Sequence, residues 1–179
     1  MANSRSNLMA NLLAGTRNDV RLGHSRYRSR VITVTLDNTE AAGHLVPLYR
    51  FSLKDIIHQI WVSHPNIAGA TDVNVGPWTS VDWTLGDGTA LDADILVDGY
   101  SMAVATTVGK WADMTVAGAA GGHTSTTIGR QLWEDAGYAT EAAAYLAQPL
   151  GTVDLVMQFV ADPGAAATIK VKIDYSAGD

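Results

Sequence analysis

Near the C-terminus, one stretch of the chain alternates apolar and polar side chains without a break. Across residues 168–175, one parity holds Ile169, Val171, Ile173 and Tyr175, and the other holds Lys170, Lys172 and Asp174. Successive side chains of a β-strand point to opposite faces of the sheet. This spacing therefore predicts a strand with one face against a core and the other in solvent. A chain that contains such a strand must also supply a sheet for it to join.

The preceding segment, residues 152–161, is expected to be a second strand. One face carries Val153, Leu155, Met157 and Phe159, while Val156 and Val160 make the opposite face apolar too. An apolar second face is typical of a strand covered on both sides, here by another sheet or by another subunit. Between the two strands, residues 162–164 (Asp-Pro-Gly) have strong turn chemistry, so the strands are predicted to form a hairpin.

Segments upstream also favour strands. Residues 31–36 are rich in β-branched side chains, and residues 80–85 place Val81, Trp83 and Leu85 on one face, which predicts a strand with Trp83 in the core. Residues 56–62 fit either a strand or a short helix, and residues 131–148 permit one or two short helical turns.

Short strands divided by Gly, Asp, Asn and Pro clusters are typical of a two-sheet fold. A length of 179 residues suits one domain with a hydrophobic core. We therefore predict a mainly β protein, either an antiparallel β-sandwich or a jelly-roll-like domain, preceded by an extended, partly helical N-terminal arm. The arm is assigned to residues 1–30 and the body to residues 31–179.

The arm differs from the body in charge. Residues 1–30 carry six arginines against the single acid Asp19, a net charge of +5, so the rest of the −6 chain carries −11. Guanidinium groups pair with carboxylates or phosphates. Three interpretations remain: a solvated tail, an arm docked on a neighbouring protein, or contact with nucleic acid, for which a denser basic patch is usual.

Apolar residues in the arm recur at helical spacing behind Asn3 and Ser4, either of which is a suitable helix cap, and Gly15 would end that helix. A single helix of this length is marginal in water, so we expect it to order only against a partner. The candidate interface residues are Leu8, Met9, Leu12, Leu13, Arg17, Arg21, Arg26, Arg28 and Arg30.

Composition narrows the function further. The chain contains no cysteine, which excludes disulfides, thiolate catalysis and cysteine-based metal sites. It has no apolar run long enough to span a membrane and no signal-peptide pattern, so no membrane association is expected. The low charged fraction of 17% suggests that neighbouring proteins cover part of the surface.

Catalytic and metal-binding motifs are weak. Gly109 and Lys110 precede Trp111 rather than Ser or Thr, which excludes a phosphate-binding loop. The five histidines form no metal-binding pair of known spacing, although His58 and His64 would approach each other if their segment bends. We expect no enzyme activity, no cofactor and no metal.

A cluster of aspartates leaves two alternatives open. These are Asp82, Asp87, Asp92, Asp94 and Asp98. Acidic turn residues are the ordinary explanation, and a calcium site is the alternative, although the spacing matches no known calcium loop. A pair facing a cleft would indicate a hydrolase instead, and an exposed Trp78 or Trp111 beside the cluster would indicate a carbohydrate-binding module.

Three stretches resemble β-sandwich head proteins of tailed bacteriophages, of the capsid decoration or cement type. They are IWVSHPNIAGATDVNVG, SVDWTLGDGTALDADILVDGYSM and GTVDLVMQFVADPGAAATIKVKIDY, which together span much of residues 50–179. The resemblance implies a virion location and a non-catalytic role in stabilising the capsid surface. It also implies binding to the major capsid protein or another virion protein, and homo-oligomers. The arm departs from this pattern and also suits a tail, portal-adaptor or fibre-type protein.

Overall fold

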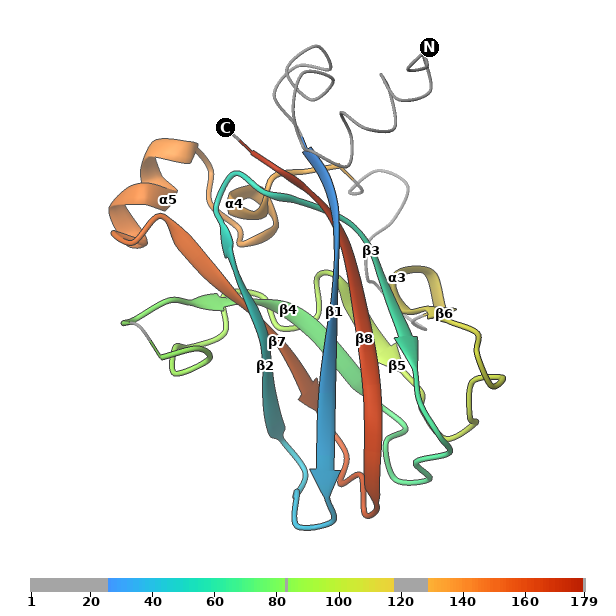
Figure 1. Ribbon diagram of the computed structural model, residues 1–179. Coiled ribbons are helices and arrows are strands. Elements are labelled where there is room, and N and C mark those ends of the chain that lie inside the picture. The colour runs from blue at the N-terminus through green and yellow to red at the C-terminus, as the bar shows by residue number, and fades with distance from the viewer. Residues whose placement is uncertain (1–25, 83, 118–128, 179) are drawn as a thin grey trace, which may run out of the picture.

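The computed structural model describes residues 26–82, 84–117 and 129–178, which fold into two antiparallel four-stranded sheets packed face to face (Figure 1). The predicted mainly β sandwich is confirmed. The first sheet has the order β1 (Arg26–Asp37), β8 (Ala166–Ala177), β3 (Ile56–Ser63) and β6 (Ala112–Asp113). The second has the order β2 (His44–Ser52), β7 (Thr152–Phe159), β4 (Val73–Thr79) and β5 (Val97–Tyr100).

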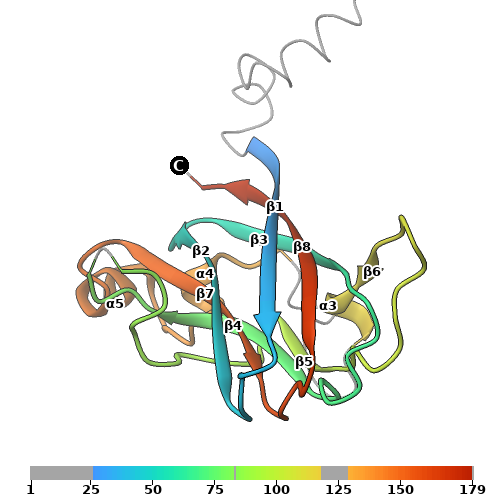
Figure 2. The ribbon, with the colours of Figure 1, turned by 60° about the horizontal axis from the view of Figure 1, so that its bottom comes forward.

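The connectivity pairs the two halves of the chain in reverse order. β1 pairs with β8, β2 with β7, β3 with β6, and β4 with β5, all antiparallel. The contacts of β8 with β3 and of β7 with β4 complete each sheet. Figure 2 shows β1, β8 and β3 in front of β2, β7 and β4 as two layers.

The hydrophobic core fills the space between the two sheets. In β8 the alternation read from the sequence is confirmed, because Ile169, Val171 and Ile173 are fully buried. They meet the equally buried Leu155 and Phe159 of β7, among others, in one continuous cluster. Val156, on the other face of β7, is also fully buried, so the same chain covers that face as well.

The predicted C-terminal hairpin is wrong. β7 and β8 follow each other in the chain but belong to different sheets, with β7 between β2 and β4 and β8 between β1 and β3. The Asp-Pro-Gly turn therefore carries the chain from one sheet to the other. Turn chemistry identifies a reversal of direction but does not say whether the two strands become neighbours.

The strand predicted at residues 80–85 is also wrong, since these residues form an irregular loop after β4. Val81 is 65% exposed rather than buried. Polar groups divert the backbone from a sheet, because Thr84 donates its N–H to the Asp82 carboxylate, a local bond that competes with strand pairing. Trp83, which was expected in the core, lies outside the described residues.

The other two expected segments are found as predicted. Residues 56–62 form a strand, and residues 131–148 contain the short helices α4 (Leu132–Asp135) and α5 (Glu141–Ala147). A further helical turn, α3 (Met114–Ala117), follows β6. In the described part of the chain, no helix has the length and apolar character needed to cross a membrane.

One strand and one strand boundary differ from the prediction. β2 was not expected, because Pro47 interrupts its sequence pattern. β1 begins at Arg26, so the last residues assigned to the arm continue directly into a strand. The division of the chain at residue 31 stays a prediction.

Candidate functional site

The arm residues proposed from the sequence fall into two groups. Leu8, Met9, Leu12, Leu13, Arg17 and Arg21 lie outside the described residues, as does the side chain of Arg26. Arg28 and Arg30 lie in β1, where both are exposed. The Arg30 guanidinium lies over the Tyr49 ring, 3.9 Å from its centroid, and so joins β1 to β2 of the other sheet.

The outer face of the first sheet carries a row of aromatic and charged side chains. Tyr27 of β1 stacks on His58 of β3 with ring centroids 5.5 Å apart. The His58 ring nitrogen Nε2 is 2.6 Å from the Ser176 hydroxyl of β8. Tyr27 is 62% exposed, whereas Ser176 is buried at 6%.

Asp174 is the centre of this row. Its carboxylate accepts a hydrogen bond from the Trp61 indole N–H at 2.9 Å and forms an ion pair with Lys172 at 3.0 Å. Burial of the carboxyl acts to raise its pKa, but hydrogen bonds from Ser29, Lys172 and Trp61 outweigh this effect and hold the pKa below its usual value. The charge stays on Asp174 at neutral pH.

The outer face of the second sheet is built differently, around Asp154 of β7. This carboxylate is fully buried and binds the Arg50 guanidinium of β2 with two hydrogen bonds, of 2.5 and 2.9 Å. It also accepts the Ser80 hydroxyl at 2.9 Å and the Gly86 N–H at 2.8 Å. Although burial acts to raise the pKa of Asp154, these bonds lower it overall.

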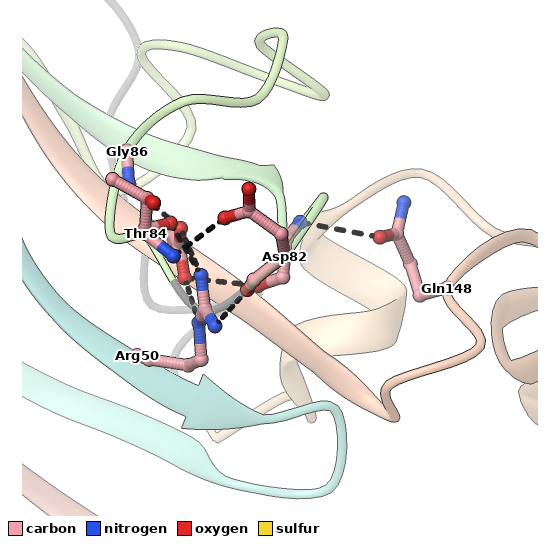
Figure 3. Close-up of polar contacts among 7 residues, drawn as sticks. Arg50, Asp82, Thr84, Gly86 and Gln148 are labelled. Atoms are coloured by element: carbon pink, nitrogen blue, oxygen red, sulfur yellow. Dashed lines mark hydrogen bonds and ion pairs between the residues drawn. The ribbon is translucent and has the colours of Figure 1, made fainter.

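Arg50 in turn holds the loop at residues 80–86 against the sheet. Its remaining N–H groups donate to the carbonyls of Asp82 and Thr84, as Figure 3 shows. Farther along, the backbone at Asp92 lies so close to β4 that a Cβ on Gly76 would fall 1.9 Å from the Asp92 carbonyl oxygen. The chain thus covers its own second sheet. Arg50 and Asp154 were not predicted as site residues, since neither stands in a recognisable motif.

Exposed apolar side chains gather on two segments. The loop between β5 and β6 presents Val104 at 79% exposure, Val108 at 99% and Trp111 at 36%. α5 and the turn after it present Tyr145, Leu146 and Leu150, with Leu146 at 85% exposure. Exposed apolar groups that cluster in this way are typical of surfaces that bind other proteins.

The β5–β6 loop also borders two open pockets. One, of about 450 Å³, lies between His64–Asn66, Thr106–Gly109 and the start of β8, and the other, of about 300 Å³, lies between Tyr100 and Trp111. His64 is buried with its Nε2 3.2 Å from the Tyr100 hydroxyl. Burial lowers the pKa of His64, which is therefore neutral at physiological pH.

The residues considered for catalysis or metal binding can be followed in the described ranges, where no aspartate of the cluster lines either pocket. His58 and His64 have different partners, Ser176 and Tyr100. Within the described ranges no three His, Asp or Glu side chains converge as a metal site would require. Asp92 and Asp94 do interact, and burial together with Asp94 raises the pKa of Asp92, but neither residue lines either pocket described above.

The two tryptophans considered for a sugar-binding face differ in how far they are exposed. Trp78 is only 9% exposed, whereas Trp111 is partly exposed at the smaller pocket. Trp111 is therefore the exposed ring of the two, and none of the five clustered aspartates lines the pocket beside it.

The sequence matches no family model, and no curated protein matches it. The fold, however, is similar to chains in two phage capsid structures. A chain of the capsid asymmetric unit of cyanophage Pam1 superposes with a TM-score of 0.51 at 13% identity, covering 86% of each chain. A chain in the capsid of Ralstonia phage GP4 gives a TM-score of 0.50 at 14% identity, covering 86% of this chain and 85% of that one. At these identities the likeness is one of fold.

Proposed function

We propose that this chain is a non-enzymatic structural protein of a tailed-phage virion, which binds the capsid surface and stabilises it through contacts between subunits. The observation that carries the proposal is the fold shared with chains of two phage capsids. Because the shares covered are nearly equal on both sides, the matched chains have about the length of this one. The likeness therefore extends over most of each matched chain.

The strand order supports the same conclusion. β1-β8-β3-β6 facing β2-β7-β4-β5 is the order produced when a long antiparallel ribbon of eight strands is rolled into two sheets. We assign this arrangement to the jelly roll, an architecture common in viral capsid domains. Since one fold serves many functions, the assignment supports a capsid role without deciding the partner.

The surface gives the proposal a physical basis. Binding to a capsid is favoured by apolar side chains that lie at the surface rather than in the protein's own core. The β5–β6 loop supplies three of these, Val104, Val108 and Trp111. Burial of such side chains against a shell would stabilise both partners by mass action. The major capsid protein, or another protein of the same virion, is the proposed partner.

The N-terminal arm is proposed to reach a neighbouring subunit. Its Leu8, Met9, Leu12 and Leu13 would pack there, and Arg17 and Arg21 would pair with carboxylates. β1 starts at Arg26 and pairs with β8 along its whole length. A deletion that tests the arm therefore has to end at residue 25, which leaves the sandwich complete.

The test is binding to empty shells of the major capsid protein from the same virion. The full chain should sediment with the shells and raise the temperature at which they break open. Deletion of residues 2–25 should leave the unfolding temperature of the free protein unchanged but weaken sedimentation at least tenfold. A full chain that stays in the supernatant at every concentration would overturn the proposal, and a deletion variant that protects shells as well as the full chain would overturn the role of the arm.

A further inference from the structure

The two sheets end in four edge strands, and these differ in length. β6 has 2 residues and β5 has 4, whereas β2 has 9 and β1 has 12. An edge strand presents unpaired N–H and C=O groups, to which another strand can add. Only the two long edges offer enough backbone for such pairing.

The β2 edge is protected. Pro47 lacks an N–H, and the register with β7 shifts between Pro47 and Tyr49. The backbone at Gly86 also lies against Pro47, since a Cβ at Gly86 would be 2.7 Å from the Pro47 Cβ. A proline, a bulge and a covering loop are the usual devices that keep an edge from pairing.

Among the described residues, the β1 edge shows no proline, no bulge and no further strand beside it. Its sequence contains neither proline nor glycine, and its 12 residues keep one uninterrupted register with β8, from Arg26↔Ala177 to Asp37↔Ala166. No described residue outside β8 pairs with it in the strand ladders. Residues 31–35 are all β-branched, a composition that favours an extended strand.

The charges along β1 favour a second, antiparallel copy of the same strand as its partner. Arg28 and Arg30 lie toward its N-terminal end, while Asp37 and, just beyond the strand, Glu40 lie at its C-terminal end. A second β1 added antiparallel would bring the arginines of each copy toward the carboxylates of the other. Parallel addition would instead place like charges side by side, which is destabilising.

We propose that β1 is a self-association edge, at which two copies of the chain pair antiparallel about a two-fold axis and join their first sheets into one continuous sheet. The exposed Val31 and Thr33, near the middle of the strand, lie close to that axis. The second copy is favoured over a strand of unrelated sequence because one strand carries both halves of the charge pattern. This inference concerns the free protein and does not depend on the capsid role.

Cross-linking tests the geometry, because the full-length chain has no cysteine of its own. Single variants Tyr27→Cys, Val31→Cys, Thr33→Cys and Thr35→Cys each place one thiol on the exposed row of β1. Oxidation should give covalent dimers chiefly at Val31→Cys or Thr33→Cys, with much less at Tyr27→Cys. The control is Leu146→Cys on α5, which is 85% exposed. Dimers formed no more readily at β1 than at residue 146 would overturn the proposal.

Solution mass tests the same edge independently. The full chain should have twice the mass of one copy by light scattering. The double variant Val31→Lys/Thr33→Lys, which sets four ammonium groups together at the axis, should be a monomer with an unchanged unfolding temperature. The matched control, Val104→Lys/Val108→Lys, should remain a dimer. A wild-type monomer, or a Val31→Lys/Thr33→Lys dimer, would overturn the proposed self-association at β1. The proposed binding to the capsid would not be affected by either result.

Discussion

Each sheet carries one buried aspartate on its outer face, and the two carboxylates have different surroundings. Asp154 of β7 sits beneath a loop, with its carboxylate shared among Arg50, Ser80 and the Gly86 backbone. Asp174 of β8 is instead held by side chains of its own sheet, such as Trp61 of β3 and Lys172 of β8. The second sheet is thus closed by the protein itself, whereas the first is left open along β1.

This difference indicates where a partner has room. A face already covered by its own loop gains little from a further layer, whereas a face with exposed aromatic and charged side chains still has surface to bury. The following experiments test whether the two faces differ as described.

The largest effect is expected for Asp154→Ala. Removal of this carboxylate leaves the Arg50 guanidinium partly buried without its ion-pair partner, so the free energy of unfolding should fall by about 3–5 kcal/mol. Denaturant unfolding at neutral pH measures it. As a control, Arg50→Met/Asp154→Leu removes both charges and should recover most of the loss. A fall below about 1 kcal/mol would mean that the loop is held by other contacts.

A smaller loss is expected for Asp174→Ala. The Lys172 ammonium is partly exposed and can bind water instead, so the variant should lose about 1–2 kcal/mol, mainly from the hydrogen bonds to the charged carboxylate. The same unfolding measurement applies. A loss equal to that of Asp154→Ala would contradict the view that this face is open to solvent.

Acid should remove the contribution that each of the two aspartates makes to the free energy of unfolding. The pKa values of Asp154 and Asp174 are both lowered in the folded state, so their contributions are complete above the unfolded value of 3.8 and are lost as the pH falls through the folded pKa. Stability measured at neutral pH and below about pH 4 should show the wild type losing more than Asp154→Ala. A constant difference between the two proteins would show that Asp154 is not ionised in the fold.

The smallest effect on stability is expected at the β5–β6 loop. Val108 is 99% exposed, so Val108→Asp should change the free energy of unfolding by less than about 0.5 kcal/mol. Sedimentation with capsid shells should nevertheless weaken. Thr107→Asp places the same charge one residue away, and equal loss in both variants would point to general repulsion rather than to a contact of Val108.

Periodicity identified the parts of the fold that depend on one face being buried. The alternation in β8 holds because Ile169, Val171 and Ile173 meet the core of the opposite sheet. The same pattern at residues 80–85 failed, because the backbone there binds Arg50 of β2, 32 and 34 residues upstream in the chain. Such a long-range polar contact leaves no period in the sequence.

Pairing was harder to predict than strand formation. Turn residues between β7 and β8 predicted a hairpin, but these strands pair with β2 and β1 at the other end of the chain. The arm at residues 1–30 stays a prediction from charge, whereas the unprotected β1 edge was not predicted. Its exposure depends on which strand lies beside it, which only the assembled sheet defines.

The pairing of β1 with β8 also has a consequence for synthesis. Among the described strands β8 is the only ladder partner of β1, and it is the last to leave the ribosome. The first strand therefore waits, with its β-branched stretch unpaired, until translation of the body is nearly finished. Contacts this distant in sequence are formed slowly. During that interval both edges of the first strand are available to strands of other chains.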